Sequence, residues 1–464
     1  MQKILSQVNN YPQKNSTESK GYEGVQTIIG ITENHLVEVN FTTEHLMEYI
    51  FSPGNLNKGY LQVRRNAGGC GVDRMEIAEL LPYLRHHKDD LVKSLMQGTY
   101  RPNPVRRVEI PKDNGKKRQL GIPSVVDRVI QQSISQVLTL IYDRTFSNSS
   151  FGFRPKRSCH DALRKVQTHV NESYKYAIDL DLEKFFDTVN HSKLIEVLSR
   201  TIKDNHLLSL IHKYLNAGVV VSNKFEETTL GVPQGGPLSP LLSNIMLNEL
   251  DKELESRGHR FVRYADDCMI LCKSKRAANR TKESIIGFIE DELFLKVNKE
   301  KTKVGYIKGL KFLGYSFYVS KGVCKLSLHS KSKVKLRLKL KELTSRSKGF
   351  GYERCKIKLK EYIQGWISYY KLADMKKYLQ SVDEWLRRGL RMCIWKCWKK
   401  TKTKFINLMK CKTDRYQAWQ WANTRKSYWR TSKSPILQRA LDTASLRLAG
   451  YTFLLDYYCK VYRK

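Results

Sequence analysis

Two adjacent aspartates lie between two apolar runs in the middle of the chain. Residues 261–264 (FVRY) precede residues 265–267 (ADD), and residues 268–271 (CMIL) follow. Both runs predict β-strands joined by a tight turn. Neighbouring carboxylates against a buried sheet repel each other, and such a turn more often carries Asn-Gly or Asp-Gly. A solvated turn is the simpler reading, but the close apolar flanks favour a functional carboxylate pair, Asp266 and Asp267.

A second expected strand also carries carboxylates. Residues 176–182 (YAIDLDL) form a short apolar run that Asp179 and Asp181 interrupt. One carboxylate from this strand and two from the turn could bind a pair of Mg²⁺ ions, because Mg²⁺ prefers hard oxygen ligands. Two such ions stabilise the attacking and leaving oxygens of an in-line phosphoryl displacement. The carboxylate pattern therefore predicts nucleotidyl transfer.

Positive charge is concentrated in the last third of the chain. The 464 residues include 83 Lys and Arg against 45 Asp and Glu, a formal net charge of +38. Residues 321–464 hold 37 basic and 9 acidic residues, together with all seven tryptophans. A basic segment interleaved with aromatic residues is typical of a nucleic-acid surface. The charge surplus therefore predicts a polyanionic partner.

Several classes of protein are excluded by what the sequence lacks. It contains no apolar run long enough for a transmembrane helix, so no membrane association is expected. Its N-terminus has no signal-peptide core. The ten cysteines include no CxxC pair, so we expect neither a structural zinc site nor a disulfide scaffold. These features predict a cytoplasmic protein with reduced thiols.

The hydrophobic periodicity predicts an α+β region followed by a helical region. A hairpin is expected over 105–123, where two β-rich runs flank a Gly-containing turn. Residues 334–340 alternate as a strand would, but their composition favours a helix. The other expected strands are 176–182, 261–271 and 311–318, and the other expected helices are 125–142, 191–217, 238–257, 275–293, 359–370 and 379–397.

The Tyr-Ala-Asp-Asp box at 264–267, with Phe186 five residues after Asp181, resembles the palm of reverse transcriptases. Further motifs narrow the resemblance to reverse transcriptases of bacterial group II introns, the maturases. These motifs are 110–112 (IPK), 118–123 (RQLGIP), 150–155 (SFGFRP), 231–240 (GVPQGGPLSP), 295–298 (LKVN), 301–303 (KTK), 312–315 (FLGY), 364–370 (QGWISYY) and 385–388 (WLRR). The resemblance covers about residues 45–460, and the ordered set is far more specific than any single motif.

The resemblance implies a right-hand polymerase, an α+β fold with fingers and an antiparallel palm sheet flanked by helices. An α-helical thumb or maturase domain would follow. The expected domains are a polar extension at 1–43, a helical extension of the fingers at 44–85, fingers and palm at 86–323, the thumb or maturase domain at 324–405 and a basic DNA-binding segment at 406–464.

By resemblance, Asp181, Asp266 and Asp267 are the catalytic carboxylates and bind two Mg²⁺ ions, which Mn²⁺ can replace. The backbone carbonyl of Leu182 would be a further metal ligand. Asp179 competes for the first position, and Asp181 is preferred because the family places an aromatic residue five positions after the catalytic aspartate.

The resemblance also implies nucleotide-binding residues. Phe186 would exclude the ribose 2′-hydroxyl and so select deoxynucleotides, although a core position is the alternative. Lys112 and Arg118 would bind the triphosphate, with Arg118 in the bidentate manner that phosphate favours. Gln234 would lie against the templating base pair, and Arg154 would contact the triphosphate or the template.

Other basic and aromatic residues complete the expected sites. Lys301 or Lys303 would protonate the leaving pyrophosphate, and the sequence does not choose between them. Trp395 and Trp398 fit a helix core better than a base-stacking surface, whereas Trp419, Trp421 and Trp429 lack an apolar period and could stack on bases. The expected nucleic-acid-binding residues are Arg387, Arg388, Arg391, Lys396 and Lys399.

The implied function is RNA-directed DNA polymerisation combined with maturase activity. The protein would assist splicing of its group II intron RNA and copy it into DNA during target-primed retrohoming. Its partners would be the intron RNA, an RNA template with a DNA primer, target DNA and dNTPs, with nucleoid association when it is bound to DNA. Without a CxxC-braced nuclease module, no endonuclease domain is expected. A splicing-only RNA-binding protein and a host-defence reverse transcriptase without an intron are the alternatives.

Overall fold

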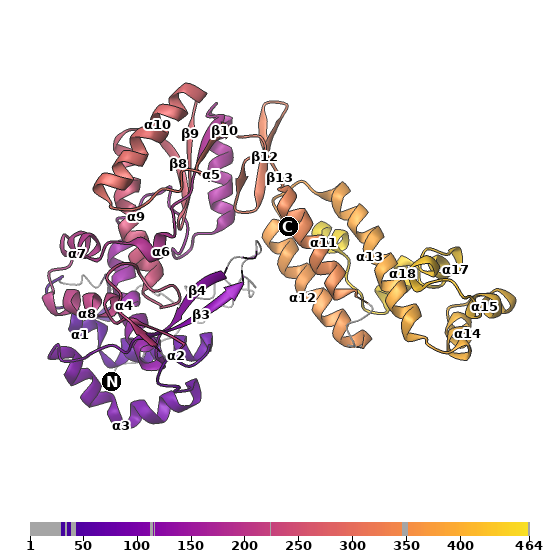
Figure 1. Ribbon diagram of the computed structural model, residues 1–464, viewed down its shortest axis with the longest axis horizontal. Helices are drawn as coiled ribbons and strands as arrows, with labels where there is room; N and C mark the ends of the chain where they lie inside the picture. Colours follow the sequence, from indigo (N-terminus) through magenta and orange to yellow (C-terminus); the bar gives the residue numbers. More distant parts are fainter. Residues whose placement is uncertain are drawn as a thin grey trace. The chain divides into compact units, whose positions relative to one another are not determined.

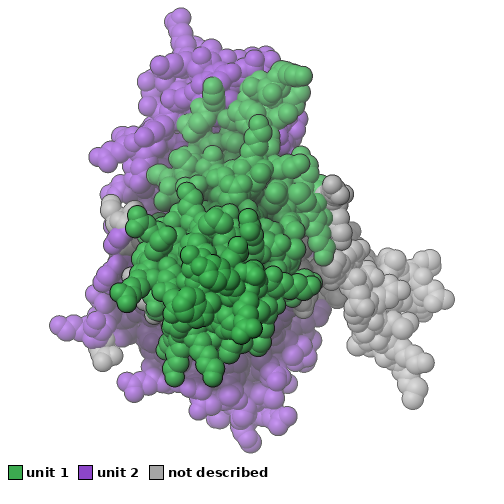
Figure 2. Space-filling view, turned by 90° about the vertical axis from the view of Figure 1, so that its right-hand side faces the viewer, with its two compact units in different colours: residues 1–16, 308–464 green, residues 17–307 purple. Residues whose placement is uncertain are grey.

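The computed structural model describes residues 29–32, 35–38, 43–111, 115, 117–222, 224–345 and 351–462. The chain forms two compact units, one of residues Thr17–Ile307 and one that includes Lys308–Lys464 (Figure 2). Most of the expected extension at 1–43 lies outside the described residues, except for β1 (Ile29–Thr32) and β2 (His35–Glu38), which pair antiparallel.

The first unit contains an antiparallel four-stranded sheet, which we call the central sheet (Figure 1). Its strand order is β10-β5-β9-β8, and the register sets Leu180 opposite Cys268 and Tyr264 opposite Asp267. The expected hairpin and carboxylate strand are therefore confirmed, and they are neighbours in one sheet. The strands are β5 (Tyr176–Leu180), β8 (Arg260–Tyr264), β9 (Asp267–Cys272) and β10 (Lys303–Tyr306).

One buried helix organises the helical part of this unit. α4 spans Val125–Tyr142, as the periodicity predicted, and most of its residues are buried. The side-chain oxygen of Ser124 caps it by accepting the Asp127 amide at 3.1 Å. The helices packed against α4 are α1 (Leu46–Ile50), α2 (Pro53–Asn66), α3 (Ile77–Met96) and α9 (Ser239–Ser256). The helices beside the central sheet are α5 (Cys159–Asn171), against β8, and α10 (Lys275–Gly287), against β5, β9 and β10.

The expected hairpin at 105–123 belongs to a second sheet of the same unit. Its strands pair antiparallel, and the sheet order is β4-β3-β6-β7 with β3 and β6 parallel. The Gly121 amide donates a 2.7 Å hydrogen bond to the Gln234 carbonyl, which fixes the hairpin to the Gly- and Pro-rich turn at 231–240. The strands are β3 (Val105–Pro111), β4 (Lys117–Ile122), β6 (Val219–Val221) and β7 (Lys224–Glu226).

Three expected elements are divided in the structure. The helix expected at 191–217 is α7 (His191–Ser199) and α8 (Asn205–Leu215), because the Asp204 carboxylate caps α8 and accepts the Met47 amide. The strand expected at 311–318 is β11 (Lys311–Phe312) and β12 (Tyr315–Ser320), because Leu313 and Gly314 adopt positive φ angles. The helix expected at 275–293 ends at Gly287 and continues as a π-helical turn, Phe288–Glu292.

The second unit combines a small sheet with a helix bundle. β11, β12 and β13 (Val323–Leu328) pair antiparallel, so the chain divides after Ile307, before the boundary at 323 that the sequence suggested. The helix favoured at 334–340 is confirmed as part of α11, which buries Leu336 and Leu340 and exposes Val334 and Leu338. The bundle helices are α11 (Ser330–Leu343), α12 (Tyr352–Tyr370), α13 (Lys376–Cys397) and α19 (Leu454–Tyr462).

Five further helices lie between α13 and α19 in the chain. The core prediction for Trp395 and Trp398 is confirmed, because both are buried and their rings meet edge to face with centroids 5.8 Å apart. All ten cysteines are free thiols. Within the part of the chain that the structure describes, no helix could span a bilayer. The five helices are α14 (Thr401–Lys410), α15 (Arg415–Ala422), α16 (Tyr428–Thr431), α17 (Pro435–Ala440) and α18 (Thr443–Leu448).

Candidate active site

The predicted catalytic carboxylates gather at one edge of the central sheet. Asp266 lies in the β8–β9 turn and Asp267 is the first residue of β9. Asp181 directly follows the last residue of β5, and because Leu180 pairs with Cys268, it reaches the level of that turn. Both turn carboxylates are exposed. The sheet thus brings together two segments that lie far apart in the sequence.

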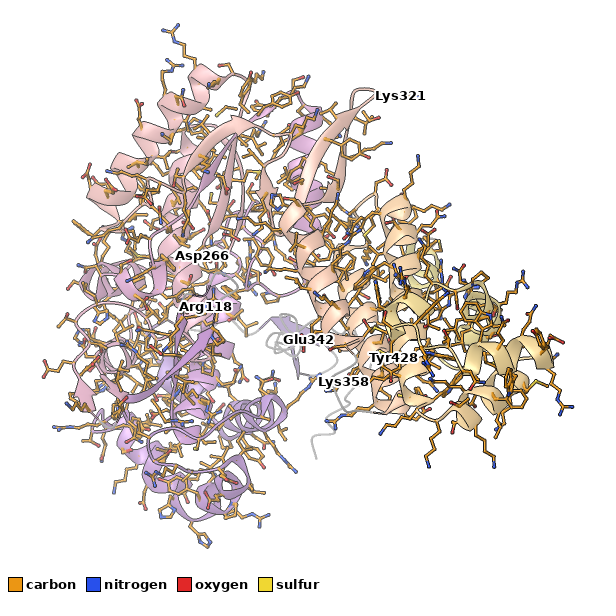
Figure 3. The ribbon with its side chains drawn as sticks, turned by 45° about the vertical axis from the view of Figure 1, so that its right-hand side comes forward. Arg118, Asp266, Lys321, Glu342, Lys358 and Tyr428 are labelled. Atoms are coloured by element: carbon orange, nitrogen blue, oxygen red, sulfur yellow. The ribbon has the colours of Figure 1, made fainter. Side chains whose placement is uncertain are left out.

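The electrostatics of Asp266 show which charged groups face it. The surrounding protein desolvates the carboxyl group and raises its pKa, and the negative charge of Asp181 raises it further. Arg118 on β4 and Arg263 on β8 lower the pKa. Arg118 and Asp266 are labelled on neighbouring elements of the first unit in Figure 3. Since Asp266 is still open to solvent, its carboxylate is available to a cation or a substrate.

Lys301 and Lys303, between which the sequence did not choose as proton donor, have different surroundings in the structure. The ammonium group of Lys301 lies 2.8 Å from Asp181 Oδ2, and the hydrogen bond to this carboxylate raises the pKa of Lys301. Lys303 instead begins β10, where its backbone pairs with Asp179. The segment that carries Lys301 also holds the backbone of Asp181, whose carbonyl accepts the Asn298 amide at 2.8 Å. Lys301 is therefore the lysine beside the predicted catalytic carboxylate.

The carboxylates have the chemistry that a hard divalent cation requires. Asp181 and Asp266 are close enough to repel each other, and a positive group, the Lys301 ammonium, already lies against Asp181. Oxygen donors of this kind suit Mg²⁺. Across the described ranges, no three or more His, Cys, Asp or Glu side chains form a group arranged to hold a metal ion. The metal-binding roles of Asp267 and the Leu182 carbonyl therefore stay predictions.

Phe186 lies next to this carboxylate edge in the chain. It belongs to the short helix α6 (Phe185–Thr188) and is partly exposed, whereas Phe185 is buried in the core. The Phe186 carbonyl accepts the Val232 amide at 2.6 Å, two residues before Gln234. Gln234 in turn accepts the Gly121 amide through its own carbonyl. Backbone hydrogen bonds thus join the predicted steric gate, the predicted template contact and the hairpin that carries Arg118.

Two predicted nucleotide contacts have a different outcome. Lys112 lies outside the described residues. Arg154 points into the protein, with 3% of its side chain exposed. Its guanidinium donates to the Asp143 carboxylate and to the Asp143, Ser147 and Ser150 carbonyls, at 2.6 to 3.1 Å. These bonds occupy the guanidinium in holding a loop, so the substrate contact expected of Arg154 is not what the structure supports.

The three arginines predicted to bind nucleic acid lie along α13 and also pack within their own unit. Arg387 lies over the Phe453 ring at 5.9 Å, and Arg388 lies over the Trp429 ring at 3.9 Å. Arg391 donates to the Leu441 carbonyl at 2.9 Å, and burial lowers its pKa. All three keep part of their surface exposed. The contacts hold their positions on the helix while leaving charge at the surface.

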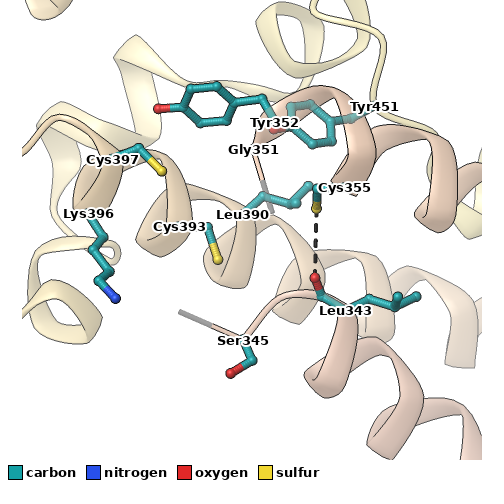
Figure 4. A pocket seen from close by; sticks show the side chains of 10 residues that line it. All are labelled: Leu343, Ser345, Gly351, Tyr352, Cys355, Leu390, Cys393, Lys396, Cys397 and Tyr451. Carbon is teal, nitrogen blue, oxygen red and sulfur yellow. Dashed lines mark hydrogen bonds between the residues drawn. The ribbon is translucent and has the colours of Figure 1, made fainter. Parts of the chain in front are cut away.

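Lys396 and Lys399 differ in their surroundings. Lys399 is exposed. Lys396 lines a small pocket in the second unit with Cys355, Cys393 and Cys397 (Figure 4). Burial raises the pKa of Cys393 to about 12 and also raises that of Cys355, so both thiols stay protonated near neutral pH. Cys355 and Cys393 are therefore not reactive thiols, whereas the third cysteine of the pocket, Cys397, is exposed.

The aromatic residues of the last segment are unequal in exposure. Trp419 is 62% exposed and Tyr416, one helical turn earlier on α15, is 73% exposed. Trp421 and Trp429 instead lie beneath the cations of Lys426 and Arg388. Exposed aromatic rings on a basic segment are suited to base stacking. Of the three predicted tryptophans, Trp419 thus presents the most accessible ring.

Sequence reasoning missed one buried charge cluster at the site. Arg263 directly precedes the Tyr-Ala-Asp-Asp box, and it forms a completely buried ion pair with Asp251 of α9. The signal that could have revealed it is a charged residue inside an otherwise apolar strand. An arginine at such a position needs a buried partner.

Comparison with known proteins agrees with this architecture. A family model described as reverse transcriptase (RNA-dependent DNA polymerase) matches residues 110–317, and one described as group II intron, maturase-specific domain matches residues 334–412. Protein YkfC of Escherichia coli (strain K12) is 34% identical over 284 residues, covering 53% of this chain and 74% of YkfC. Together with the carboxylate edge, these matches define a reverse transcriptase.

Relatives from introns narrow the class further. Group II intron-encoded protein LtrA of Lactococcus lactis subsp. cremoris is 33% identical over 297 residues, covering 50% of this chain and 49% of LtrA. The putative COX1/OXI3 intron 2 protein of Saccharomyces cerevisiae is 32% identical over 326 residues, 58% of this chain and 36% of that protein. The chain thus spans about half of LtrA. It belongs to the group II intron reverse transcriptase and maturase family, as its motifs predicted.

Proposed function

We propose that the protein copies group II intron RNA into DNA at the carboxylate edge of its central sheet and assists splicing of that RNA. Its proposed partners are the intron RNA, an RNA template with a DNA primer, target DNA and dNTPs. Retrohoming into a DNA target, a cytoplasmic location and nucleoid association when bound to DNA belong to the same proposal. The basic helical unit supports it, because exposed Lys399, Tyr416 and Trp419 suit contacts to phosphates and bases.

The proposed reaction is nucleotidyl transfer. The primer 3′-hydroxyl oxygen attacks the α-phosphorus of a dNTP and loses its proton to solvent. The bond from that phosphorus to the bridging oxygen breaks, and pyrophosphate leaves with a proton supplied by Lys301. Asp181, Asp266, Asp267 and the Leu182 carbonyl would hold two Mg²⁺ ions, or Mn²⁺ in their place. When bound, these ions neutralise the charge that develops on the attacking and leaving oxygens.

Residues around the carboxylates have separate roles in this proposal. Arg118 neutralises the triphosphate, because it already lies within electrostatic reach of Asp266. Phe186 excludes a 2′-hydroxyl with its partly exposed ring. Gln234 lies against the templating pair, positioned by the bond between its carbonyl and the Gly121 amide.

The observation that carries the proposal is the charge arrangement at the sheet edge. Asp181 and Asp266 repel each other between two cationic side chains, Lys301 and Arg118. Such repulsion is destabilising unless a bound cation or substrate group relieves it. A carboxyl group with a raised pKa, such as that of Asp266, is typical of functional sites.

Primer extension on an RNA template with dNTPs and Mg²⁺ tests the proposal. We expect the wild type to extend the primer and Asp266→Asn to lose extension by at least about 100-fold, because the variant removes a charge that acts on the transition state. Asp89→Asn is the matched control, since its side chain is 99% exposed on α3. Absence of extension by the wild type, or wild-type extension by Asp266→Asn, would contradict the proposal.

A further inference from the structure

The strand that leads into the catalytic turn contains a completely buried arginine. Neither Arg263 of β8 nor Asp251 of α9 exposes any side-chain surface. Nε of Arg263 donates to Asp251 Oδ1 at 2.7 Å, and Nη2 donates to Oδ2 at 2.5 Å. A bidentate pair of this kind fixes the plane of the guanidinium as well as its position. The remaining nitrogen, Nη1, therefore has a defined direction.

That nitrogen points at the catalytic turn. Nη1 donates to the Ala265 carbonyl at 3.0 Å and to Asn244 Oδ1 at 2.9 Å. Ala265 has a φ of +57°, in the left-handed region that residues with a side chain rarely adopt. Such a conformation persists only where neighbouring groups hold it. The bond from Arg263 holds the residue that sets the direction of Asp266 and Asp267.

The opposite side of the turn is held by the 150–155 motif. The Phe151 amide donates to the Arg263 carbonyl at 2.9 Å, and a Cβ atom on Gly152 would lie 2.2 Å from the Ala265 nitrogen. Only glycine fits such a close approach of two backbones. Asn244 joins both sides, because its Nδ2 donates to the Gly152 carbonyl at 2.8 Å. The turn is therefore clamped between a buried ion pair and a glycine.

We propose that Arg263, oriented by Asp251 and Asn244, is a positioning residue that fixes the turn carrying Asp266 and Asp267 for nucleotidyl transfer. The inference rests on the proposed function of these aspartates. Arg263 itself does not touch substrate, since its whole guanidinium is occupied inside the protein. The alternative is that the ion pair serves stability alone. In that case, removing both charges together would leave kcat unchanged in a folded protein.

The double variant Arg263→Met/Asp251→Leu separates these two roles. Replacing a buried ion pair with apolar side chains of similar volume often preserves stability, whereas removing one partner leaves an uncompensated charge. The double variant also removes the bond to the Ala265 carbonyl. We expect its melting temperature and its KM for template–primer to stay near wild type while kcat falls about 100-fold, the usual effect of small misplacement of reacting groups. Arg263→Lys keeps the positive charge but lacks the bidentate guanidinium. Its kcat should therefore lie between those of the wild type and the double variant.

A second readout is independent of activity. Hydrogen exchange of the peptide spanning 261–272, measured without metal or nucleotide, should be faster in the double variant than in the wild type. Asp127→Asn is the control, because it changes another buried carboxylate of the same unit that accepts from Tyr100 and Tyr214. This control should lower the melting temperature without changing exchange in that peptide or kcat.

Gly152→Ala keeps the test decisive if the double variant does not fold. The added Cβ atom clashes with the Ala265 backbone and displaces the same turn without altering the ion pair. This variant should therefore also lower kcat and speed exchange in the 261–272 peptide. Unchanged kcat and unchanged exchange in a folded double variant, or in Gly152→Ala, would overturn the proposal. Extension by the wild type in the same experiment tests the proposed function separately, and the exchange result does not depend on it.

Discussion

Replacing Asp383 with Asn should change how the stability of the helical unit depends on pH. Asp383 of α13 is 3% exposed and accepts the amides of Leu454 and Leu455 at 2.9 and 2.8 Å, at the start of α19. Burial raises the pKa of Asp383 to about 6 from 3.8, although the two amides and Arg387 oppose this rise. The same helix carries Arg387, Arg388 and Arg391, so this buried carboxylate connects the helix of these arginines to α19.

The sign and size of the effect follow from linkage. A carboxyl group whose pKa is raised by folding binds its proton more tightly in the folded state. Its contribution to stability is therefore complete below the unfolded pKa and is lost as the pH rises through the folded pKa. A rise of about two pKa units corresponds to about 3 kcal/mol. The Asn variant carries no such proton, so it lacks this loss.

Urea unfolding followed by tryptophan fluorescence measures the effect, because all seven tryptophans lie in residues 321–464. The free energy of unfolding of Asp383→Asn, relative to wild type, should rise by about 3 kcal/mol between about pH 3 and pH 7. Asp442→Asn should show the opposite sign, since the Ser445 amide and hydroxyl lower the pKa of the exposed Asp442. A difference between Asp383→Asn and wild type that does not vary with pH would show that folding does not raise the pKa of Asp383.

Three further predictions concern the proposed polymerase. Phe186→Ala should raise the incorporation of ribonucleotides at least about tenfold relative to deoxynucleotides in single-nucleotide extension, because it opens space for the 2′-hydroxyl; unchanged discrimination would exclude Phe186 as the gate. Lys301→Ala should lower kcat about 100-fold, the usual effect of losing a general acid, while Lys303→Ala should have little effect. Equal losses of kcat in both variants would contradict the assignment of Lys301, and not Lys303, as the proton donor. The affinity for intron RNA, measured by filter binding, should fall by about three to five decades between about 50 and 200 mM salt if roughly 6–10 phosphates are contacted. Lys399→Ala should reduce the slope of log affinity against log salt concentration by about one. A wild-type slope near zero would contradict the proposal that the basic second unit binds RNA phosphates.

Much of the fold could be predicted because hydrophobic period and turn chemistry act locally. The helix Val125–Tyr142 has an uninterrupted apolar period and a serine cap, and its predicted bounds are the observed ones. The break before Asn205 was missed because it depends on Asp204 accepting the amide of Met47, a residue far away in the sequence. The break at Gly314 likewise has a tertiary cause, since a Cβ atom there would lie 2.6 Å from the Tyr370 hydroxyl.

The carboxylates of the candidate site could be predicted from the sequence, but the contacts of the basic residues around them could not. Asp181 and Asp266 stand out because a charge in an apolar strand or a tight turn is costly. Nothing local indicates that Arg263 pairs with Asp251 or that Arg154 turns inward, because both depend on which carboxylates and carbonyls the fold brings near. The position of Lys301 was equally hidden, since Lys303 has the same local character and only the fold places Lys301 beside Asp181.

In our proposal, catalysis depends on the carboxylate edge of the first unit, whereas RNA binding and splicing do not. RNA-templated extension and intron splicing can both be measured with one preparation of Asp181→Asn/Asp266→Asn. We expect extension to be abolished while splicing assistance and the affinity for intron RNA stay at wild-type levels. Extension at the wild-type rate by this double variant, or loss of RNA binding together with extension in a folded protein, would contradict the proposal.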